Sequence, residues 1–288
     1  MRHLNPVDKL LLAYLLLTGG LAFSLSNFLL VGLHLALLIL VVLLSRYAPR
    51  PIRVLYASLV VPLLYMELDS LSGLAGGRLY DPEVLAVERW LFGDPTPAMW
   101  MSEKLPWLLL SEFLHFCYLA YYPLLVLVAV RLYLKTTERI TLNYLWCLQA
   151  ATFSDYLIQM NFPVQGPRPL FPPLAESLHG FCWRLCHYLC GEGAAGAAAF
   201  PSGHVTFAMV VLFFCWKHER EGFDIFAPFC LGLSLCTVYG RFHYVVDAMA
   251  GTLVALVFVV SGPRLYSLME RRQDRVPSPQ KDLLERER

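Results

Sequence analysis

Long apolar runs separated by short polar segments dominate the chain. A helix needs about 20 mainly apolar residues to cross roughly 30 Å of hydrocarbon, and the pattern predicts eight such spans. The last three are short, which is typical of helices that other helices surround. The predicted spans are residues 10–25, 28–45, 54–72, 107–130, 141–160, 203–216, 225–239 and 248–261.

The composition excludes an ordinary soluble domain. Apolar residues make up 57% of the 288 positions and charged residues 16%, against about 25% charged in soluble domains. A single soluble core of this length could not bury so much apolar surface. The net charge of +1 is spread along the chain, so no basic patch indicates nucleic acid as a partner. We expect an all-α, polytopic membrane helix bundle in contact with membrane lipids.

The distribution of Lys and Arg predicts the orientation. With the N-terminus in the cytoplasm, eight spans place most of the 23 basic residues on the cytoplasmic side. Both termini are therefore predicted to be cytoplasmic. The pattern divides the chain into two N-terminal transmembrane helices (1–50), a membrane core of six helices (51–265), on which the motifs described below fall, and a charged cytoplasmic tail (266–288).

Two long connections, 73–106 and 161–202, are predicted on the non-cytoplasmic side. Both are too rich in aromatic residues for disordered segments. The first contains PEVLAVERWLF, whose Val84, Trp90 and neighbouring apolar residues predict an amphipathic helix at the membrane interface.

Three short motifs follow in order on the predicted non-cytoplasmic side: Gly-Pro-Arg-Pro at 166–169, Pro-Ser-Gly-His at 201–204, and Arg-Phe-His-Tyr-Val-Val-Asp at 241–247. Arg168 offers a planar guanidinium that suits phosphate oxygens. Ser202 and Gly203 begin a predicted helix, whose free N–H groups form an anion site.

The two motif histidines supply the reactive groups. Asp247 follows His243 by four residues, so on a helix its carboxylate could hold one imidazole nitrogen and leave the other as a nucleophile. His204 could then protonate the departing oxygen. The pattern predicts phosphoryl transfer to and from His243 that requires no metal or other cofactor. Because the motifs lie near the membrane surface, we expect an amphiphilic lipid phosphate as substrate.

The ordered motifs resemble those of the type 2 phosphatidic acid phosphatase superfamily. The resemblance implies a six-helix core, a phosphohistidine at His243, Asp247 as its orienting residue and His204 as the general acid. It also implies that Arg168, Ser202 and Gly203 bind the phosphate.

The chain departs from the family pattern at two basic positions. Asn161 stands where the first motif usually has Lys, and Thr237 stands where the third usually has Arg. Arg241 is the candidate phosphate binder that could replace them. The strings GPRPLFPP and YGRFHYVVD look closer to the inositol phosphorylceramide synthase branch, which implies head-group transfer to a lipid alcohol as the alternative to phosphatase activity. A non-catalytic lipid-binding scaffold is a further alternative.

Other polar residues within the apolar spans need partners or a cavity. Four carboxylates could bind a polyol head group or a cation, pair with the motif arginines, or form a structural network: Glu67, Asp69, Glu112 and Asp155. A tyrosine patch at 118, 121 and 122 favours helix packing, with a lipid entry path as the alternative.

Three cysteines at spacings of four, Cys182, Cys186 and Cys190, lie beside His187. Thiolates and imidazole bind zinc. Spacing of four, however, places the thiols along a stripe, so the sequence favours an amphipathic helix without a metal.

Overall fold

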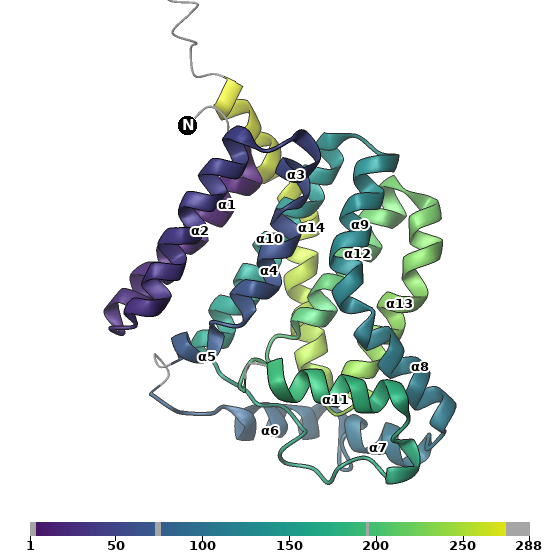
Figure 1. Ribbon diagram of the computed structural model, residues 1–288. Coiled ribbons are helices and arrows are strands. Elements are labelled where there is room, and N and C mark those ends of the chain that lie inside the picture. The colour runs from purple at the N-terminus through teal and green to yellow at the C-terminus, as the bar shows by residue number, and fades with distance from the viewer. Residues whose placement is uncertain (1–3, 73–75, 194–195, 275–288) are drawn as a thin grey trace, which may run out of the picture.

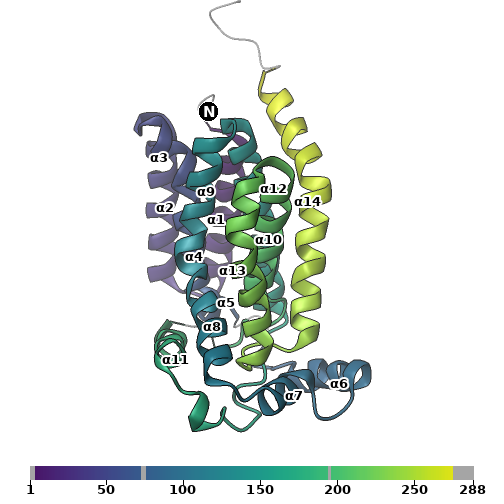
Figure 2. The same cartoon turned by 90° about the vertical axis from the view of Figure 1, so that its right-hand side faces the viewer.

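The computed structural model describes residues 4–72, 76–193 and 196–274, and these are mostly helical. Within these ranges the extended pairing is limited to an isolated bridge between Val164 and Ala198. The long helices run side by side, and shorter ones lie across one end of the bundle (Figures 1 and 2). This arrangement confirms the predicted all-α membrane helix bundle.

The first two predicted spans form a helical hairpin, α1 (Pro6–Ser24) and α2 (Phe28–Tyr47). The third predicted span is broken into three helices, α3 (Arg50–Leu55), α4 (Ala57–Tyr65) and α5 (Leu68–Leu71). Pro62 lies inside α4. Because proline lacks an N–H and its ring crowds the preceding turn, it weakens the helix at this point.

The fourth predicted span consists of α8 (Leu108–Leu119) and α9 (Tyr121–Lys135), which meet at an angle of 53°. Pro123 lies one turn beyond Leu119, so its ring would clash with the Leu119 carbonyl in a straight helix. The remaining predicted spans fall on α10 (Glu138–Asn161), α12 (Gly203–His218), α13 (Arg220–Tyr239) and α14 (Val245–Asp274).

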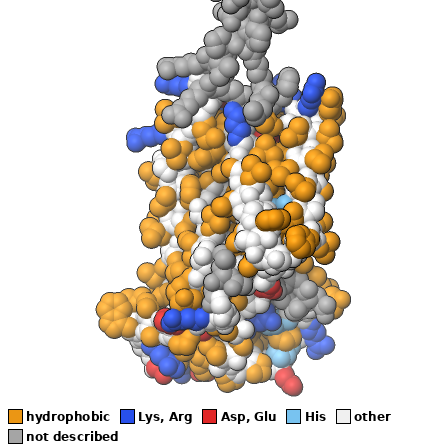
Figure 3. Space-filling model, turned by 90° about the vertical axis from the view of Figure 1, so that its left-hand side faces the viewer, with side chains coloured by type: hydrophobic (Ala, Val, Ile, Leu, Met, Phe, Trp, Pro, Cys, Tyr) orange, Lys and Arg blue, Asp and Glu red, His pale blue; other side chains and the backbone are white. Residues whose placement is uncertain are grey.

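Four of the described helices, α1, α2, α13 and α14, are long and apolar enough to cross a membrane, and the bent pair α8–α9 would make a fifth. Apolar side chains cover the middle of the bundle, and charged ones gather towards its two ends (Figure 3). These features are those of an integral membrane protein, while the count of eight spans stays a prediction. Helix α14 continues beyond the predicted start of the tail at 266, and residues 275–288 lie outside the described residues.

The shorter helices α6 (Asp81–Phe92), α7 (Pro97–Lys104) and α11 (Phe181–Gly193) lie across the end opposite the N-terminus (Figures 1 and 2). The predicted interfacial segment around Val84 therefore forms a helix that lies across the bundle end. The loops that carry the three motifs are at this same end.

Candidate active site

Close packing of α12 on α14 brings two motifs together. A Cβ atom at Gly251 on α14 would lie 2.4 Å from the Ser202 carbonyl oxygen, so only glycine allows this approach. The Ser202 N–H donates to the Asp247 carbonyl oxygen at 3.0 Å. The segment that precedes α12 is thereby fixed beside the segment that opens α14.

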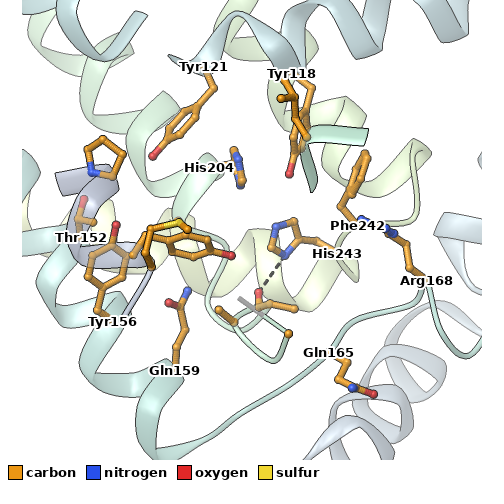
Figure 4. Close-up of a pocket in the computed structure, with 18 of the residues that line it drawn as sticks. Tyr118, Tyr121, Thr152, Tyr156, Gln159, Gln165, Arg168, His204, Phe242 and His243 are labelled. Atoms are coloured by element: carbon orange, nitrogen blue, oxygen red, sulfur yellow. Dashed lines mark hydrogen bonds between the residues drawn. The ribbon is translucent and has the colours of Figure 1, made fainter. Parts of the chain in front are cut away.

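A cavity of about 1090 Å³ opens beside these segments. His204, Gly203, His243 and Arg168, from all three motifs, line it (Figure 4). Tyrosine, threonine and glutamine side chains from α9 and α10, with apolar side chains from α4, complete much of the wall. The structure therefore gathers the predicted reactive side chains around a single space.

His243 has a defined orientation. Its Nδ1 lies 2.8 Å from the carbonyl oxygen of Ala199 and 3.6 Å from Oδ2 of Asp247. Because a carbonyl oxygen only accepts, Nδ1 carries the proton, and Nε2 of the neutral ring holds a lone pair. In the described part of the chain, no hydrogen bond to Nε2 is formed. An imidazole with one nitrogen bound and the other free has the orientation that a nucleophile requires.

Asp247 contributes differently from the prediction. Its carboxylate is fully buried, and Oδ2 accepts the Tyr244 N–H at 2.8 Å. The helix begins only at Val245, so His243 lies in the preceding turn and not on the helical face assumed by a spacing of four. The Ala199 carbonyl therefore makes the shorter contact with Nδ1, and Asp247 adds negative charge beside it.

His204 is half-buried in the first turn of α12, between two tyrosine rings. The centroid of its ring lies 4.5 Å from that of Tyr118 and 4.6 Å from that of Tyr121. The His204 and His243 ring centroids are 5.9 Å apart. Figure 4 shows both imidazoles at the same cavity wall, with the two tyrosines around His204. This separation is short enough for a single group of the size of a phosphoryl group to contact both rings.

Arg168 enters the cavity from the loop after α10. Its guanidinium lies over the Phe242 ring, 5.3 Å from the centroid. Gly166 has φ +86°, and a Cβ there would lie 2.6 Å from the Phe242 carbonyl oxygen. Glycine is needed both for the backbone conformation and for the close approach. The loop is thus held against the chain immediately before His243.

The N-terminus of α12 presents free backbone donors. Ser202 precedes the helix, and its hydroxyl makes no capping hydrogen bond. The hydroxyl oxygen is buried and has no partner among the described residues. The N–H groups of the first turn, from Gly203 onward, have no intrahelical acceptors and favour an anion.

Arg241 is not brought into the cavity. Its guanidinium donates to the Ser102 hydroxyl, with Nη2 at 2.8 Å, and to the Pro172 carbonyl oxygen. The side chain is buried, and burial lowers the pKa of its guanidinium. Arg241 is therefore not among the residues that line the cavity, and its expected role as a phosphate binder in place of the missing basic residues stays a prediction. The Arg241 guanidinium instead connects Ser102 on α7 to the loop that contains Pro172.

Asn161 and Thr237, which stand where the family pattern has basic residues, make other contacts in this structure. The Asn161 amide donates to the Leu157 carbonyl oxygen within α10 at 2.8 Å. Thr237 is buried, and its carbonyl oxygen accepts the N–H groups of Phe242 and His243 at 3.0 and 2.8 Å. Thr237 thereby holds the turn that carries His243.

Three of the four carboxylates from the predicted spans have local partners. Glu67 pairs with His34, with Oε2 3.1 Å from Nε2. Asp69 accepts the Gly196 N–H at 2.8 Å. Glu112 accepts the N–H groups of Cys182 and Trp183 at 2.8 and 3.0 Å, where α11 begins.

Asp155 differs from these three because its carboxylate is fully buried on α10 and, in the described part of the chain, makes no hydrogen bond as close as theirs, with Thr206 as its polar neighbour. Its Oδ2 lies 4.0 Å from the position that a Cβ would take at Gly203. Within the described ranges, neither Arg168 nor Arg241 forms an ion pair with any of the four carboxylates.

The tyrosine patch lies at the cavity, since Tyr118, Tyr121 and Tyr122 all contribute to its wall. Their position therefore favours the alternative, a lipid entry path.

The cysteine segment lies on α11. Cys182 is half-buried and Cys186 is buried on this helix, and the Cys190 side chain lies outside the described residues. Burial lowers the pKa of the neighbouring His187 to about 3, so this imidazole is neutral beside Arg168.

Two contacts at the site were not predicted from the sequence. One is the hydrogen bond between His243 and the Ala199 carbonyl, and the other is the position of the Arg168 guanidinium over the Phe242 ring. Every residue has a carbonyl group, so no sequence signal marks Ala199. Phe242 stands inside the third motif, and an aromatic residue adjacent to a reactive histidine is a signal that could have been used.

Comparison with known proteins supplies one match. A family model described as the PAP2 superfamily matches residues 82–261, which is more than half of the chain. No curated protein and no solved structure matches significantly.

Proposed function

Because this chain belongs to the PAP2 superfamily, we propose that it is an integral-membrane enzyme that transfers the phosphoryl group of a lipid phosphate through a phosphohistidine at His243. The proposed scheme uses only side chains and backbone groups of the chain itself. It places the site at the bundle end opposite the N-terminus, on the non-cytoplasmic side if the termini are cytoplasmic (Figure 1).

The orientation of His243 is the observation that carries this proposal. The Ala199 carbonyl accepts from Nδ1 at 2.8 Å, so Nε2 keeps its lone pair at the cavity that Arg168 and His204 also line. By contrast, His34 has both ring nitrogens engaged by the protein, Nδ1 at the Leu30 carbonyl oxygen and Nε2 at the Thr18 hydroxyl, and it lies outside this cavity.

In the first step, Nε2 of His243 attacks phosphorus and forms a P–N bond. The bond from phosphorus to the leaving oxygen breaks, and His204, whose protonated form the bound phosphate anion favours, gives its proton to that oxygen. Arg168 and the N–H groups of the first turn of α12 stabilise the negative charge on the other phosphoryl oxygens. Asp247 stabilises the positive charge that develops on the His243 ring.

In the second step, an oxygen nucleophile attacks the phosphohistidine. His204, now neutral, takes the proton from this nucleophile, the new P–O bond forms and the P–N bond breaks. Water as the nucleophile releases phosphate, whereas a lipid alcohol gives a new phospholipid. His243 and protonated His204 return to their starting states in either case.

Head-group transfer is the second candidate, because the cavity extends beyond the histidines along α10. Thr152, Tyr156 and Gln159 line this part. Gln159 donates from Nε2 to the Pro201 carbonyl oxygen at 2.8 Å, while its Oε1 is buried without a partner in the described chain. A free acceptor in the cavity favours a substrate with hydroxyl donors, as a polyol head group has.

The test uses the purified full chain with a chelator present. Phosphatidic acid, a polyprenyl diphosphate, and phosphatidylinositol with either ceramide or diacylglycerol are supplied in turn. Free phosphate and new lipids are both measured. In parallel, a phosphate-labelled substrate is quenched rapidly, and label on the protein is tested for the acid lability and base stability of phosphohistidine.

Free phosphate together with labelled protein supports a phosphatase. A new phospholipid without free phosphate supports the head-group transferase. Labelling must disappear in His243→Ala, and label that survives this substitution contradicts the assigned nucleophile. A scaffold with no enzymatic role would bind these lipids but give neither product nor labelled protein.

A further inference from the structure

Helix α6 carries two buried carboxylates on one side, Asp81 at its start and Glu88 two turns later. Asp81 is 5% exposed and Glu88 is fully buried. Val84 is buried between them, whereas Glu83 on the same helix is exposed. A buried carboxylate destabilises the folded protein unless it accepts hydrogen bonds. The N–H groups that donate to each carboxylate therefore indicate what it does in the structure.

Asp81 holds the loop of the first motif. Its Oδ1 accepts the Gln165 and Gly166 N–H groups at 3.1 and 2.9 Å, and its Oδ2 accepts the Gln165 N–H at 3.0 Å. The chain reaches Arg168 two residues after Gly166. The position of the Arg168 backbone relative to the cavity therefore depends on the Asp81 carboxylate.

Glu88 holds the segment that follows His243. Its two carboxylate oxygens accept the N–H groups of Val245 and Val246 at 3.1 and 3.0 Å. These are the first two residues of α14, whose N–H groups have no acceptor within the helix. Glu88 thus caps α14 from another helix, immediately after His243.

The apolar contacts of α6 complete this arrangement. Val84 packs in a small cluster with Val164, Ala199, Tyr244 and Val246. Ala199 donates its N–H to the Val164 carbonyl oxygen at 2.8 Å, and its own carbonyl accepts from His243. The same helix therefore contacts the loop of Arg168, the acceptor of His243 and the beginning of α14.

From these contacts we propose that Asp81 and Glu88 are positioning residues that set the distance between the phosphate-binding Arg168 and the nucleophile His243. Asp81 acts through the 165–166 backbone and Glu88 through the 245–246 backbone, and α6 is the rigid connection between them. This inference rests on the proposed function, because Arg168 and His243 need a fixed separation only if they act on the same phosphate.

The proposal predicts different kinetic effects for two nearly isosteric substitutions. In Glu88→Gln the amide can accept one N–H but not both, so His243 is less well placed and kcat falls roughly tenfold to a hundredfold with KM little changed. In Asp81→Asn the Arg168 loop is loosened, so KM rises roughly tenfold and orthovanadate, a phosphate mimic, binds correspondingly less tightly. Glu83→Gln on the exposed side of α6 is the matched control and should match wild type.

The experiment measures kcat and KM for phosphatidic acid, the thermal shift that orthovanadate produces, and the unfolding temperature without ligand. The expected result is a loss of kcat in one variant and of phosphate affinity in the other, at unfolding temperatures close to wild type. A purely structural role would instead lower the unfolding temperature in both variants and leave the rate per folded molecule unchanged, which overturns the proposal. If Glu88→Gln yields no folded protein, Asp81→Asn alone decides the outcome. A loss of orthovanadate affinity at an unchanged unfolding temperature supports the proposal, and a lower unfolding temperature with unchanged affinity overturns it.

His243→Ala in the same series separates this inference from the proposed function. If His243→Ala is inactive while Asp81→Asn and Glu88→Gln behave like Glu83→Gln, only the positioning roles are wrong. If His243→Ala turns over at the wild-type rate, the proposed function is wrong. If the wild type turns over no phosphatidic acid, the orthovanadate shift still decides whether Asp81 organises the phosphate site.

Discussion

In the described part of the chain, two buried histidines lie within 4 Å of a carboxylate oxygen, and these two pairs differ in what the second ring nitrogen contacts. His34 lies on α2 and approaches Glu67, and His243 precedes α14 and approaches Asp247. Both rings direct Nδ1 to a backbone carbonyl oxygen, of Leu30 at 2.9 Å and of Ala199 at 2.8 Å.

The Nε2 atoms have different environments. Nε2 of His34 lies 2.8 Å from the Thr18 hydroxyl and 3.1 Å from Glu67, and the ring is 2% exposed. Nε2 of His243 has no hydrogen-bond partner in the described ranges, and the ring lines the large cavity. A histidine whose nitrogens are both engaged by the protein ties helices together, whereas one with a free, oriented lone pair is available for chemistry.

The largest effect is expected from removing the free nitrogen. His243→Ala should reduce kcat by roughly 10⁴-fold or more, because the residual rate without a nucleophile comes only from binding and charge stabilisation. The unfolding temperature should stay close to that of wild type. Initial rates and thermal unfolding of the purified protein measure both effects, and a wild-type rate would show that the contrast with His34 has no catalytic meaning.

His204→Ala should lower the rate by roughly 10²- to 10⁴-fold for a lipid alkyl phosphate, because the leaving alkoxide then receives no proton. The loss should be smaller for p-nitrophenyl phosphate, whose leaving oxygen needs no proton. The ratio of the two losses is the measurement. Equal losses with both substrates would mean that His204 binds phosphate instead of acting as an acid.

Breaking the other pair should have the opposite effect. Glu67→Ala removes the partner of the His34 ring in a buried site and should lower the free energy of unfolding by about 2 kcal/mol. The kcat per folded molecule should be unchanged. Denaturant unfolding in detergent checks the stability, and Leu59→Ala, at a 56% exposed position on α4, is the control. A large loss of kcat without a loss of stability would place Glu67 in the reaction.

The two arginines of the motifs differ in a similar way. Arg168 lines the cavity, whereas the guanidinium of Arg241 is hydrogen-bonded by the protein. Arg168→Lys should raise KM about tenfold, because lysine cannot make the two parallel hydrogen bonds of a guanidinium to phosphate. Arg241→Lys should leave KM near its wild-type value, since Ser102 and Pro172 already occupy that guanidinium. Equal increases in KM in the two variants would restore Arg241 as a phosphate ligand.

Part of the fold was predictable because the signals are local. Each of the eight predicted segments lies mainly on helical residues, and Pro123 follows the bend between α8 and α9. The number of membrane spans is harder to predict, because the length and hydropathy of a segment do not show whether lipid or other helices surround it.

The candidate site was predictable in its residue types but not in its contacts. The order of the three motifs indicated that Arg168, His204 and His243 belong together, and all three line one cavity. The carboxylates of α6 were overlooked, although Asp81 and Glu88 share the helix face of the buried Val84. Charged residues on the apolar face of an amphipathic helix are the signal that could have revealed them.

Local sequence was enough to predict the apolar helices and to mark two histidines, an arginine and a carboxylate as candidates for phosphoryl transfer. Which nitrogen of His243 is free and which arginine lines the cavity depend on how the helices pack. The reason is physical: helix formation and membrane insertion depend on neighbouring residues, but Nδ1 is bound by a carbonyl group 44 residues away. Arg241 is drawn away by Ser102 on α7, a contact over 139 positions that exists only once the helices have packed.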